Sequence, residues 1–353
     1  MPKTKPELVG LYRYPVPQAG RYDRLRLDKN ENTIGFSPET IQRMLGDISP
    51  HFLAAYPEPG PLYEKIAQWH GVSVKNVLIS AGSEMAIRYL FEAYLGRGDE
   101  IIYLNPSFAM FEVYARLTGA SSVMVDYDTN LSIDVNRILE RISSKTKIIA
   151  IANPNNPTGT VIPEFDLCRV LRHAQECDAL VLIDEAYYFF CTQTMLGHLK
   201  NFSNLVVTRT FSKACGLAGA RLGYAIAHES TISEMQKMQP IDHASAFALK
   251  VGEYLLDHQE LIWDYVEKVK DGKKYLMHAA AELGYRASPS FANFVLIDVA
   301  GLRERVLEEF DRCRILVGAH VRLPFSNNYI RITVGPVEHM EQVVLALRCA
   351  VQR

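Results

Sequence analysis

Short apolar runs alternate along this chain with longer stretches in which apolar residues recur at helical spacing. Between about residues 75 and 230 the apolar runs are too short for helices, which favours strands. The predicted strands cover residues 77–81, 100–104, 121–126, 147–152, 179–184, 204–210 and 221–228, and the predicted helices cover 83–95, 107–119 and 164–176. Strands that alternate with helices in this way are typical of a parallel sheet. The pattern therefore predicts an α/β fold with a mostly parallel, seven-stranded sheet.

The pattern changes after about residue 230. A long helical region runs to residue 283, followed by a strand at 294–299, a helix at 301–313, a strand at 329–334 and a closing helix. The chain before residue 40 is polar and rich in proline. With 353 residues the chain is long enough for two domains. We therefore expect a large domain over residues 41–240 and a smaller α+β domain formed by residues 1–40 and 241–353.

Composition narrows the possible partners. The 38 Lys and Arg residues nearly balance the 40 Asp and Glu residues, and no run of five like charges occurs, which argues against nucleic acid as a partner. The first residues lack an apolar signal region, and no apolar stretch reaches the roughly 18 residues of a membrane span, so we expect a cytoplasmic protein without membrane contact. The six cysteines and ten histidines show neither paired spacing nor an HExxH motif, so neither a disulfide framework nor a bound metal is expected.

Four polar motifs follow predicted strands, which is where ligands bind in an open parallel sheet. In the first motif, Ser80-Ala-Gly-Ser-Glu84, the residues Gly82 and Ser83 stand where a helix starts. Free backbone N–H groups and the positive end of the helix dipole suit a phosphate at this place. The alternative is an ordinary serine N-cap.

The second motif, Asn153-Pro-Asn-Asn-Pro-Thr-Gly159, follows a strand that we expect to be buried. Two prolines and a glycine stiffen the turn, so the asparagine side chains become donors at a fixed place. A solvent-facing loop is the alternative, but such a loop does not require this rigidity.

The third motif, Val181-Leu-Ile-Asp-Glu-Ala-Tyr187, carries Asp184 at the last position of an apolar strand. A buried carboxylate is costly without a cationic or protonated partner, so Asp184 requires a positive charge nearby. An arginine or lysine of the protein would meet this need. A Walker-type magnesium site is disfavoured because the chain has no GxxxxGKS/T sequence.

The fourth motif runs from Thr210-Phe-Ser-Lys213 to Arg221-Leu-Gly-Tyr224. It combines two hydroxyls, a lysine and an arginine on a loop whose glycine spacing does not match the GxGxxG of dinucleotide-binding loops. Lys213 becomes nucleophilic if burial lowers its pKa. The alternative is a solvated lysine beside a phosphate-binding loop.

These four motifs together match the needs of one cofactor. Pyridoxal phosphate requires an anion site for its phosphate, a donor for its phenolate oxygen and a carboxylate for its pyridinium nitrogen. It also requires a lysine that forms a Schiff base with its aldehyde. We therefore expect pyridoxal 5'-phosphate as the cofactor.

The same motifs resemble those of the fold-type-I aminotransferases, and specifically those of the histidinol-phosphate aminotransferase group. The resemblance extends from Leu27-Asp-Lys-Asn-Glu-Asn32 to Tyr329-Ile-Arg-Ile-Thr-Val-Gly335 and covers most of the chain. It implies a fold-type-I enzyme that moves an amino group between glutamate or 2-oxoglutarate and a small, phosphorylated amino compound.

The resemblance also implies a role for each matching residue. Lys213 would bind the cofactor's aldehyde and move the proton, Asp184 would keep the ring nitrogen protonated, and Tyr187 would act at the phenolate oxygen. The remaining cofactor contacts would come from Asn156 at the phenolate oxygen, from Gly82, Ser83, Thr210, Ser212 and Arg221 at the phosphate, and from Phe108 stacked on the ring.

Two further implications concern the partner subunit and the substrate. Tyr56 matches a tyrosine that reaches the cofactor phosphate of the neighbouring subunit, which implies a homodimer. Arg331 resembles the family's carboxylate-binding arginine, and an arginine fork suits a bidentate partner. Together with Arg322 and Asn32 it would bind the substrate, the two arginines serving the phosphate of the amino donor and glutamate in turn. For Arg322 the alternative is a surface arginine.

The chain differs from the family at positions that we expect on the substrate side of the site. Thr33 stands where the family usually has proline, Phe108 where it more often has tyrosine, and Glu58 where it has aspartate. The substrate therefore stays open between histidinol phosphate and serinol phosphate. Two other functions stay open as well. One is a decarboxylase of an O-phosphoamino acid that uses the same cofactor, and the other is a non-catalytic nucleotide- or phosphate-binding regulator in which Lys213 carries no cofactor.

Overall fold

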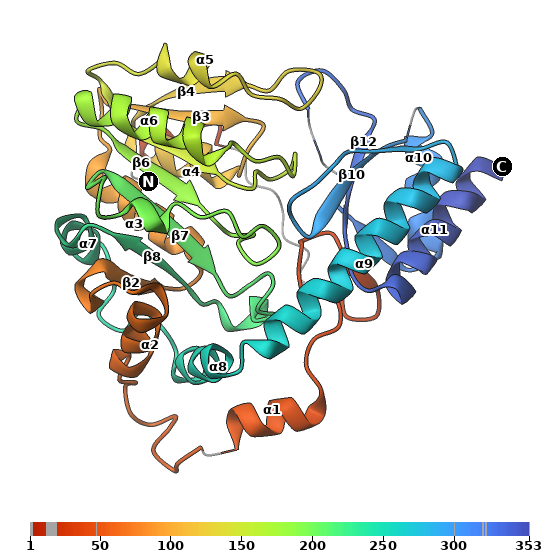
Figure 1. Cartoon of the computed structure of the whole chain (residues 1–353), viewed down its shortest axis with the longest axis horizontal. Coiled ribbons are helices and arrows are strands. Elements are labelled where there is room, and N and C mark those ends of the chain that lie inside the picture. Colours follow the sequence, from red (N-terminus) through yellow and green to blue (C-terminus); the bar gives the residue numbers. More distant parts are fainter. Residues whose placement is uncertain are drawn as a thin grey trace.

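The computed structural model describes residues 3–11, 20–46, 48–299, 301–319, 321 and 323–352. Its largest sheet consists of β2 (Val77–Ser80), β3 (Glu100–Asn105), β4 (Ser121–Asp126), β5 (Thr146–Ala152), β6 (Leu180–Asp184), β7 (Leu205–Thr210) and β8 (Gly223–Ala227). The strand order is β2-β8-β7-β6-β5-β3-β4 (Figure 1). Strand β8 runs antiparallel to β2 and β7, and the other neighbouring pairs are parallel. The predicted mostly parallel, seven-stranded α/β sheet is confirmed.

Helices cover both faces of this sheet, and the alternation along each strand divides the core between them. On β5, Ile148 and Ala150 face a cluster formed with α3 (Ser83–Tyr94), α4 (Met110–Thr118) and α7 (Glu229–Gln236). Ile149 and Ile151 face the opposite cluster, which contains α5 (Val135–Leu139) and α6 (Glu164–Glu176). Because a strand buried on both faces needs apolar residues at nearly every position, residues 148–152 of β5 and 180–183 of β6 are continuous apolar runs.

Strand β8 and helix α4 begin two or three residues later than their sequence patterns indicate. Strand β8 begins at Gly223 instead of residue 221, because Arg221 has a φ of 54°, which extended strands do not adopt. Helix α4 begins at Met110 rather than at residue 107. Ser107 instead belongs to a loop, where its hydroxyl donates to Asn155 Oδ1 at 2.7 Å.

The sequence pattern does not predict two helices near the N-terminus, α1 (Pro38–Leu45) and α2 (Gly60–His70). Helix α1 has a regular start, since the Ser37 side chain accepts a hydrogen bond from the Thr40 backbone and Pro38 occupies the first turn. Helices α2 and α8 (Ala246–Asp257) pack against the edge of the sheet formed by β2 and β8. They extend the large core beyond the predicted α/β units.

The smaller part of the structure lies to one side of the large sheet (Figure 1). Its antiparallel sheet is formed by β9 (Arg286–Ala287), β10 (Phe294–Asp298) and β12 (Tyr329–Thr333) in the order β12-β10-β9. Helices α9 (Glu260–Glu282), α10 (Arg303–Arg312) and α11 (Val337–Gln352) pack around Val295 and Ile297 of this sheet. This arrangement agrees with the helix and strand pattern predicted for the C-terminal third of the chain.

The N-terminal segment joins this smaller part. Strand β1 (Leu25–Leu27) pairs in parallel with β11 (Ile315–Val317), and the Asn30 backbone N–H donates to the Thr333 hydroxyl at 3.0 Å. The domain boundaries at residues 41 and 240 stay a prediction. Among the described residues, no helix is both long and apolar enough to span a membrane.

The two parts of the chain meet at the carboxyl ends of β5 and β6. The Phe291 N–H donates to the Gly159 carbonyl at 2.7 Å, and the Asn30 side chain donates to the Tyr187 hydroxyl at 2.8 Å. The motifs that follow the parallel strands therefore lie where the smaller part contacts the sheet.

Candidate active site

The first turn of α3 forms a backbone cradle beside β8. Gly82 is the residue that caps α3, and its φ of 82° is readily adopted only by glycine. A Cβ atom at Gly82 would lie 2.8 Å from Arg221 Nη2, and one at Gly223 would lie 2.3 Å from the Ser83 nitrogen. The two glycines thus allow β8 and a guanidinium group to approach the free N–H groups of a helix start, which suits an anion.

The other residues predicted to bind phosphate lie around Arg221. Arg221 Nη1 donates to Ser212 Oγ at 3.4 Å, and the Ser212 N–H donates to Thr210 Oγ1 at 3.1 Å. Arg221 Nη2 also lies 3.9 Å from a Glu84 carboxylate oxygen. The structure therefore brings together the five residues predicted for the phosphate, which are Gly82, Ser83, Thr210, Ser212 and Arg221.

Asp184 ends β6 and is 5% exposed. The Thr208 hydroxyl donates to its carboxylate at 2.8 Å. Burial raises the pKa of Asp184 to about 6, with the Glu185 carboxylate adding to the rise, whereas Thr208 and the Lys213 charge oppose it. The sequence predicts a cationic partner for Asp184, and Lys213 is the cation that acts on it in the structure.

Lys213 lies in the loop that follows β7. Its Nζ donates to the Lys29 carbonyl oxygen at 2.7 Å. Burial lowers the pKa of Lys213 to about 8, and the charges of Arg331 and Arg221 add to this shift. A lysine amine with this pKa is partly neutral near neutral pH, which is the form that can act as a nucleophile or a base.

The hydroxyl of Tyr187 accepts a hydrogen bond from Asn30 Nδ2 at 2.8 Å. Burial raises the pKa of Tyr187 to about 12, so the hydroxyl stays protonated and is able to donate. Asn30 is buried, has a φ of 57° and is also bonded to Thr333. The sequence interpretation selects Asn32 from the Asn-Glu-Asn segment and overlooks Asn30, since the segment does not show which asparagine faces inward.

Arg331, on β12, reaches the second motif from the smaller part of the chain. Its Nη1 donates to Asn156 Oδ1 at 2.5 Å, and its Nη2 donates to the Asp28 carbonyl at 2.6 Å. Its Nε is buried and has no hydrogen-bond partner among the residues that the structure describes. The Nε lies beside Gly318, where an added Cβ would come within 3.2 Å of it. The positive charge of Arg331 acts on Lys213. Arg322 lies outside the described residues.

Three predicted site residues have other surroundings. Asn32 Oδ1 accepts hydrogen bonds from the Ile34 and Gly35 backbones, both at 3.0 Å, and so shapes a local turn. Phe108 packs edge-on against Phe111 with ring centroids 5.6 Å apart. Tyr56 is 82% exposed. Their roles at the substrate, the ring face and the neighbouring subunit stay predictions.

Thr33, which stands where the resemblance leads us to expect proline, has a structural explanation. Its N–H donates to the Tyr265 hydroxyl at 3.2 Å, and its Oγ1 lies 3.0 Å from His339 Nδ1. Proline has no N–H and no hydroxyl, so it could form neither contact. Thr33 therefore links the N-terminal segment to α9 and α11.

Sequence reasoning also overlooks Thr208 and Arg209, which lie next to the predicted residues. Thr208 donates to Asp184, and Arg209 forms a buried ion pair with Glu185 at 2.8 Å. A local signal could have found them. The strand begins Leu-Val-Val, and Thr208 and Arg209 are polar residues that follow inside the same strand. A polar residue inside a buried strand requires a partner.

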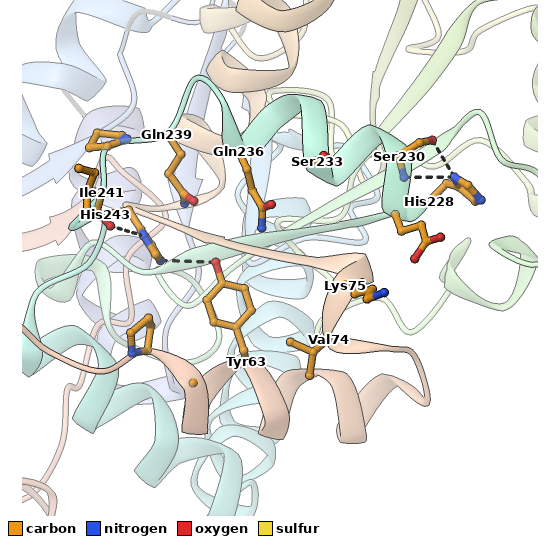
Figure 2. A pocket seen from close by; sticks show the side chains of 14 residues that line it. Tyr63, Val74, Lys75, His228, Ser230, Ser233, Gln236, Gln239, Ile241 and His243 are labelled. Atoms are coloured by element: carbon orange, nitrogen blue, oxygen red, sulfur yellow. Dashed lines mark hydrogen bonds between the residues drawn. The ribbon is translucent and has the colours of Figure 1, made fainter.

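A large open groove lies away from these residues, between α2, α7 and the loop that follows α7 (Figure 2). Its volume is about 930 Å³, and its lining combines apolar residues with polar ones that include Tyr63, Gln236, Gln239 and His243. None of the residues predicted for the site lines this groove. The size of this groove therefore does not identify it as the active site.

Comparison with known proteins places the chain among related sequences. It matches the family described as aminotransferase class I and II over residues 23–347. It is 31% identical over 342 residues to the histidinol-phosphate aminotransferase of Clostridium novyi (strain NT), covering 95% of this chain and 94% of the relative. It is 36% identical over 331 residues to the histidinol-phosphate aminotransferase of Methanosarcina barkeri (strain Fusaro / DSM 804), covering 92% of this chain and 88% of the relative.

The fold is also similar to a solved structure, the histidinol-phosphate aminotransferase from Sinorhizobium meliloti in complex with pyridoxal-5'-phosphate. The TM-score is 0.83 at 23% identity, and the match covers 99% of this chain and 98% of that chain. At this identity the likeness concerns the fold alone. It confirms the fold-type-I architecture that the motifs imply.

Proposed function

Because this chain belongs to the class I and II aminotransferases, we propose that it moves an amino group between glutamate or 2-oxoglutarate and a small, phosphorylated amino compound. The enzyme is an aminotransferase that depends on pyridoxal 5'-phosphate, and its relatives do not support the decarboxylase alternative. The observation that carries the proposal is Lys213. Its amine has a pKa lowered to about 8 and lies within electrostatic range of Asp184, Arg221 and Arg331.

The donor and acceptor groups of the site fit this cofactor. The cradle of Gly82, Ser83 and Arg221 offers backbone N–H groups and a cation to a phosphate. The buried carboxylate of Asp184 suits a protonated ring nitrogen, because a cation there would offset the cost of its burial. The guanidinium of Arg331, whose charge acts on Lys213, would bind the substrate's carboxylate.

Bound pyridoxal phosphate would supply an electron sink for the bonds at the substrate's Cα. The chain would supply the acid and base. Since the pKa of Lys213 is about 8, its Nζ could accept a proton and return it near neutral pH. Asp184, with a pKa of about 6, is ionised at neutral pH and would hold a proton at the ring nitrogen.

Two other side chains would orient the reactants. The Tyr187 hydroxyl is held by Asn30, and with a pKa of about 12 it keeps its proton near neutral pH, so it would donate to an oxygen beside the lysine. Arg331 already spans from Asn156 to the Asp28 carbonyl. A substrate carboxylate bound to Arg331 would therefore contact both parts of the chain, which positions the substrate's Cα between them.

We also propose a class of substrate, a homodimeric assembly and a cytoplasmic location for this enzyme. The relatives named histidinol-phosphate aminotransferase support a phosphorylated amino donor of the histidinol phosphate or serinol phosphate type. The exposed Tyr56 supports a homodimer in which this tyrosine reaches the neighbouring site. A cytoplasmic location stays part of the proposal.

The function is tested by one half-reaction. Cofactor-loaded protein is mixed with glutamate in the absence of a keto acceptor, and the visible absorbance band is followed together with 2-oxoglutarate. We expect the visible band to convert to the near-ultraviolet band of the pyridoxamine form, with about one 2-oxoglutarate released per site. Panels of phosphorylated amino compounds would then identify the second substrate.

A persistent visible band without 2-oxoglutarate would rule out glutamate as the donor. Borohydride reduction followed by peptide mass analysis would separate this outcome from the regulator alternative. A modified Lys213 means that the cofactor is bound in place, whereas an unmodified Lys213 favours a non-catalytic protein.

Replacing Gly82 with alanine is expected to weaken cofactor binding by about tenfold or more, because the new Cβ would displace Arg221 from the cradle. The measurement is the dissociation constant of pyridoxal phosphate and of pyridoxal without phosphate. The loss should be confined to the phosphorylated form. Gly98→Ala is the matched control, because Gly98 also has a positive φ, 98°, but its Cβ would have no neighbour within 4 Å. An equal loss in both variants would mean that backbone strain, and not the cradle, is responsible.

A further inference from the structure

A buried ion pair lies directly behind Asp184, and the reaction described above does not use it. Glu185 follows Asp184 in the chain, so its side chain points to the opposite face of the sheet. There Arg209 Nε and Nη2 donate to Glu185 Oε2 at 3.0 and 2.8 Å. The side chains of Arg209 and Glu185 are 4% and 1% exposed.

Both partners are held by further contacts. The Thr194 hydroxyl and the Met195 N–H donate to Glu185 Oε1 at 3.0 and 2.7 Å. The guanidinium carbon of Arg209 lies 3.3 Å from the centre of the Tyr188 ring. The Glu185 carboxylate therefore accepts hydrogen bonds from three protein groups.

The Glu185 charge acts on Asp184. It is one of the causes that raise the pKa of Asp184 to about 6, after burial itself. The other titratable groups that face Asp184 are Lys213, from the loop after β7, and Tyr187. The charge of Arg331, from β12, acts on both of these groups. Without a cation on Glu185, the negative charge behind Asp184 would favour protonation of Asp184 near neutral pH.

No other group around Arg209 in the described structure is placed to supply that positive charge. His70, from α2, is bonded to the Tyr224 hydroxyl at 2.9 Å, and burial together with the Arg209 charge lowers its pKa to about 3. Burial raises the pKa of Tyr224 and that of Cys215, so both stay neutral. Arg209 is thus the cation that balances Glu185.

We propose that Arg209 is a positioning residue: by neutralising Glu185 it keeps Asp184 ionised and able to hold the protonated ring nitrogen of the cofactor. This inference rests on the proposed cofactor site. It assigns to the ion pair an electrostatic role in the reaction in addition to any role in stability.

The experiment compares two ligands that differ at the ring nitrogen alone. Full-length protein freed of cofactor is titrated with pyridoxal phosphate and with its deaza analogue, which has carbon in place of that nitrogen. The ratio of the two dissociation constants, measured between pH 5 and 9, reports the ring-nitrogen contact. For the wild type the preference for pyridoxal phosphate should decline as the pH falls through about 6, where Asp184 takes up a proton.

The midpoint is the pH at which half of this preference is lost. The two single variants should move the midpoint in opposite directions. Arg209→Gln leaves the Glu185 charge unbalanced, so the midpoint should rise by about one pH unit. The preference should then fall by about twofold at pH 7 and by about ninefold at pH 5, below both midpoints. Glu185→Gln leaves the Arg209 charge, so the midpoint should fall. The double variant and the charge-conserving Arg209→Lys should both return toward the wild type. Because the two expected midpoint shifts differ in sign, the midpoint of either single variant tests the proposed role of Arg209, provided that the variant keeps the circular dichroism spectrum of the wild type.

Unchanged midpoints in a folded variant, with equal loss of affinity for both ligands, would overturn the proposal and leave Arg209 a structural role. Asp184→Asn is the control and should abolish the pH dependence of the ratio. A wild-type protein that prefers neither ligand would instead contradict the proposed cofactor site. The two failures are therefore distinguishable.

Discussion

Replacing Lys213 with alanine is expected to lower the rate of amino transfer from glutamate by at least about four orders of magnitude, since the variant loses both the amine that bonds to the cofactor and the base that moves the proton. The folded structure should remain, because the Lys213 side chain makes one hydrogen bond, to the Lys29 carbonyl, among those found in the structure. The measurement is the single-turnover rate of 2-oxoglutarate formation, with circular dichroism as the check on folding.

Lys273 provides the matched control for this variant. Burial lowers the pKa of Lys273 to about 8 as well, but its Nζ donates to the Ser290 and Ala292 carbonyls. Lys273→Met should therefore keep most of the rate, although its melting temperature is expected to fall. If Lys213→Ala retained near-normal turnover, or if both variants lost activity equally, Lys213 would not be the catalytic lysine.

Replacing Arg331 with glutamine is expected to reduce kcat/KM for glutamate by between about thirtyfold and several thousandfold. This range corresponds to the roughly 2 to 5 kcal/mol lost when one partner of a buried, hydrogen-bonded charge pair is removed. The reason is geometric, because the charge of Arg331 acts on Lys213 and its fork joins both parts of the chain.

The control for this variant is Arg286→Gln, which removes the same charge from an exposed position on β9 of the same small sheet. Its kcat/KM should match the wild type. Cofactor binding should be nearly unchanged in both variants, because Arg331 is assigned to the substrate's carboxylate. A loss of cofactor affinity in Arg331→Gln as large as the loss in kcat/KM would remove that assignment.

Several features of this protein are readable in short windows of its sequence. An apolar strand that ends in Asp184 indicates a buried carboxylate, and the structure confirms the burial. Gly82 before Ser83 indicates a helix start with free N–H groups, and α3 begins there. The alternation of strands and helices predicts the large sheet. These inferences succeed because burial, helix capping and strand alternation depend on neighbours within a few residues.

Other features depend on residues that are far apart in the chain. Asn30 meets Tyr187 across 157 residues, and Arg331 meets Asn156 across 175 residues. No local pattern distinguishes Asn30 from Asn32, because their different environments arise when the N-terminal segment docks on the smaller part of the chain. The pairing of Arg209 with Glu185 likewise depends on β6 and β7 being neighbours in register.

The local sequence thus identifies which residue types carry the chemistry and at which strand ends they lie, because those signals arise from nearest neighbours. The folded chain establishes which of those residues face one another and how their charges act. The lowered pKa of Lys213 is the clearest case, since its causes are burial together with Arg331 and Arg221, which come from separate segments. Electrostatic effects of this kind depend on distance and burial in three dimensions, and neither quantity is recorded in the order of the residues.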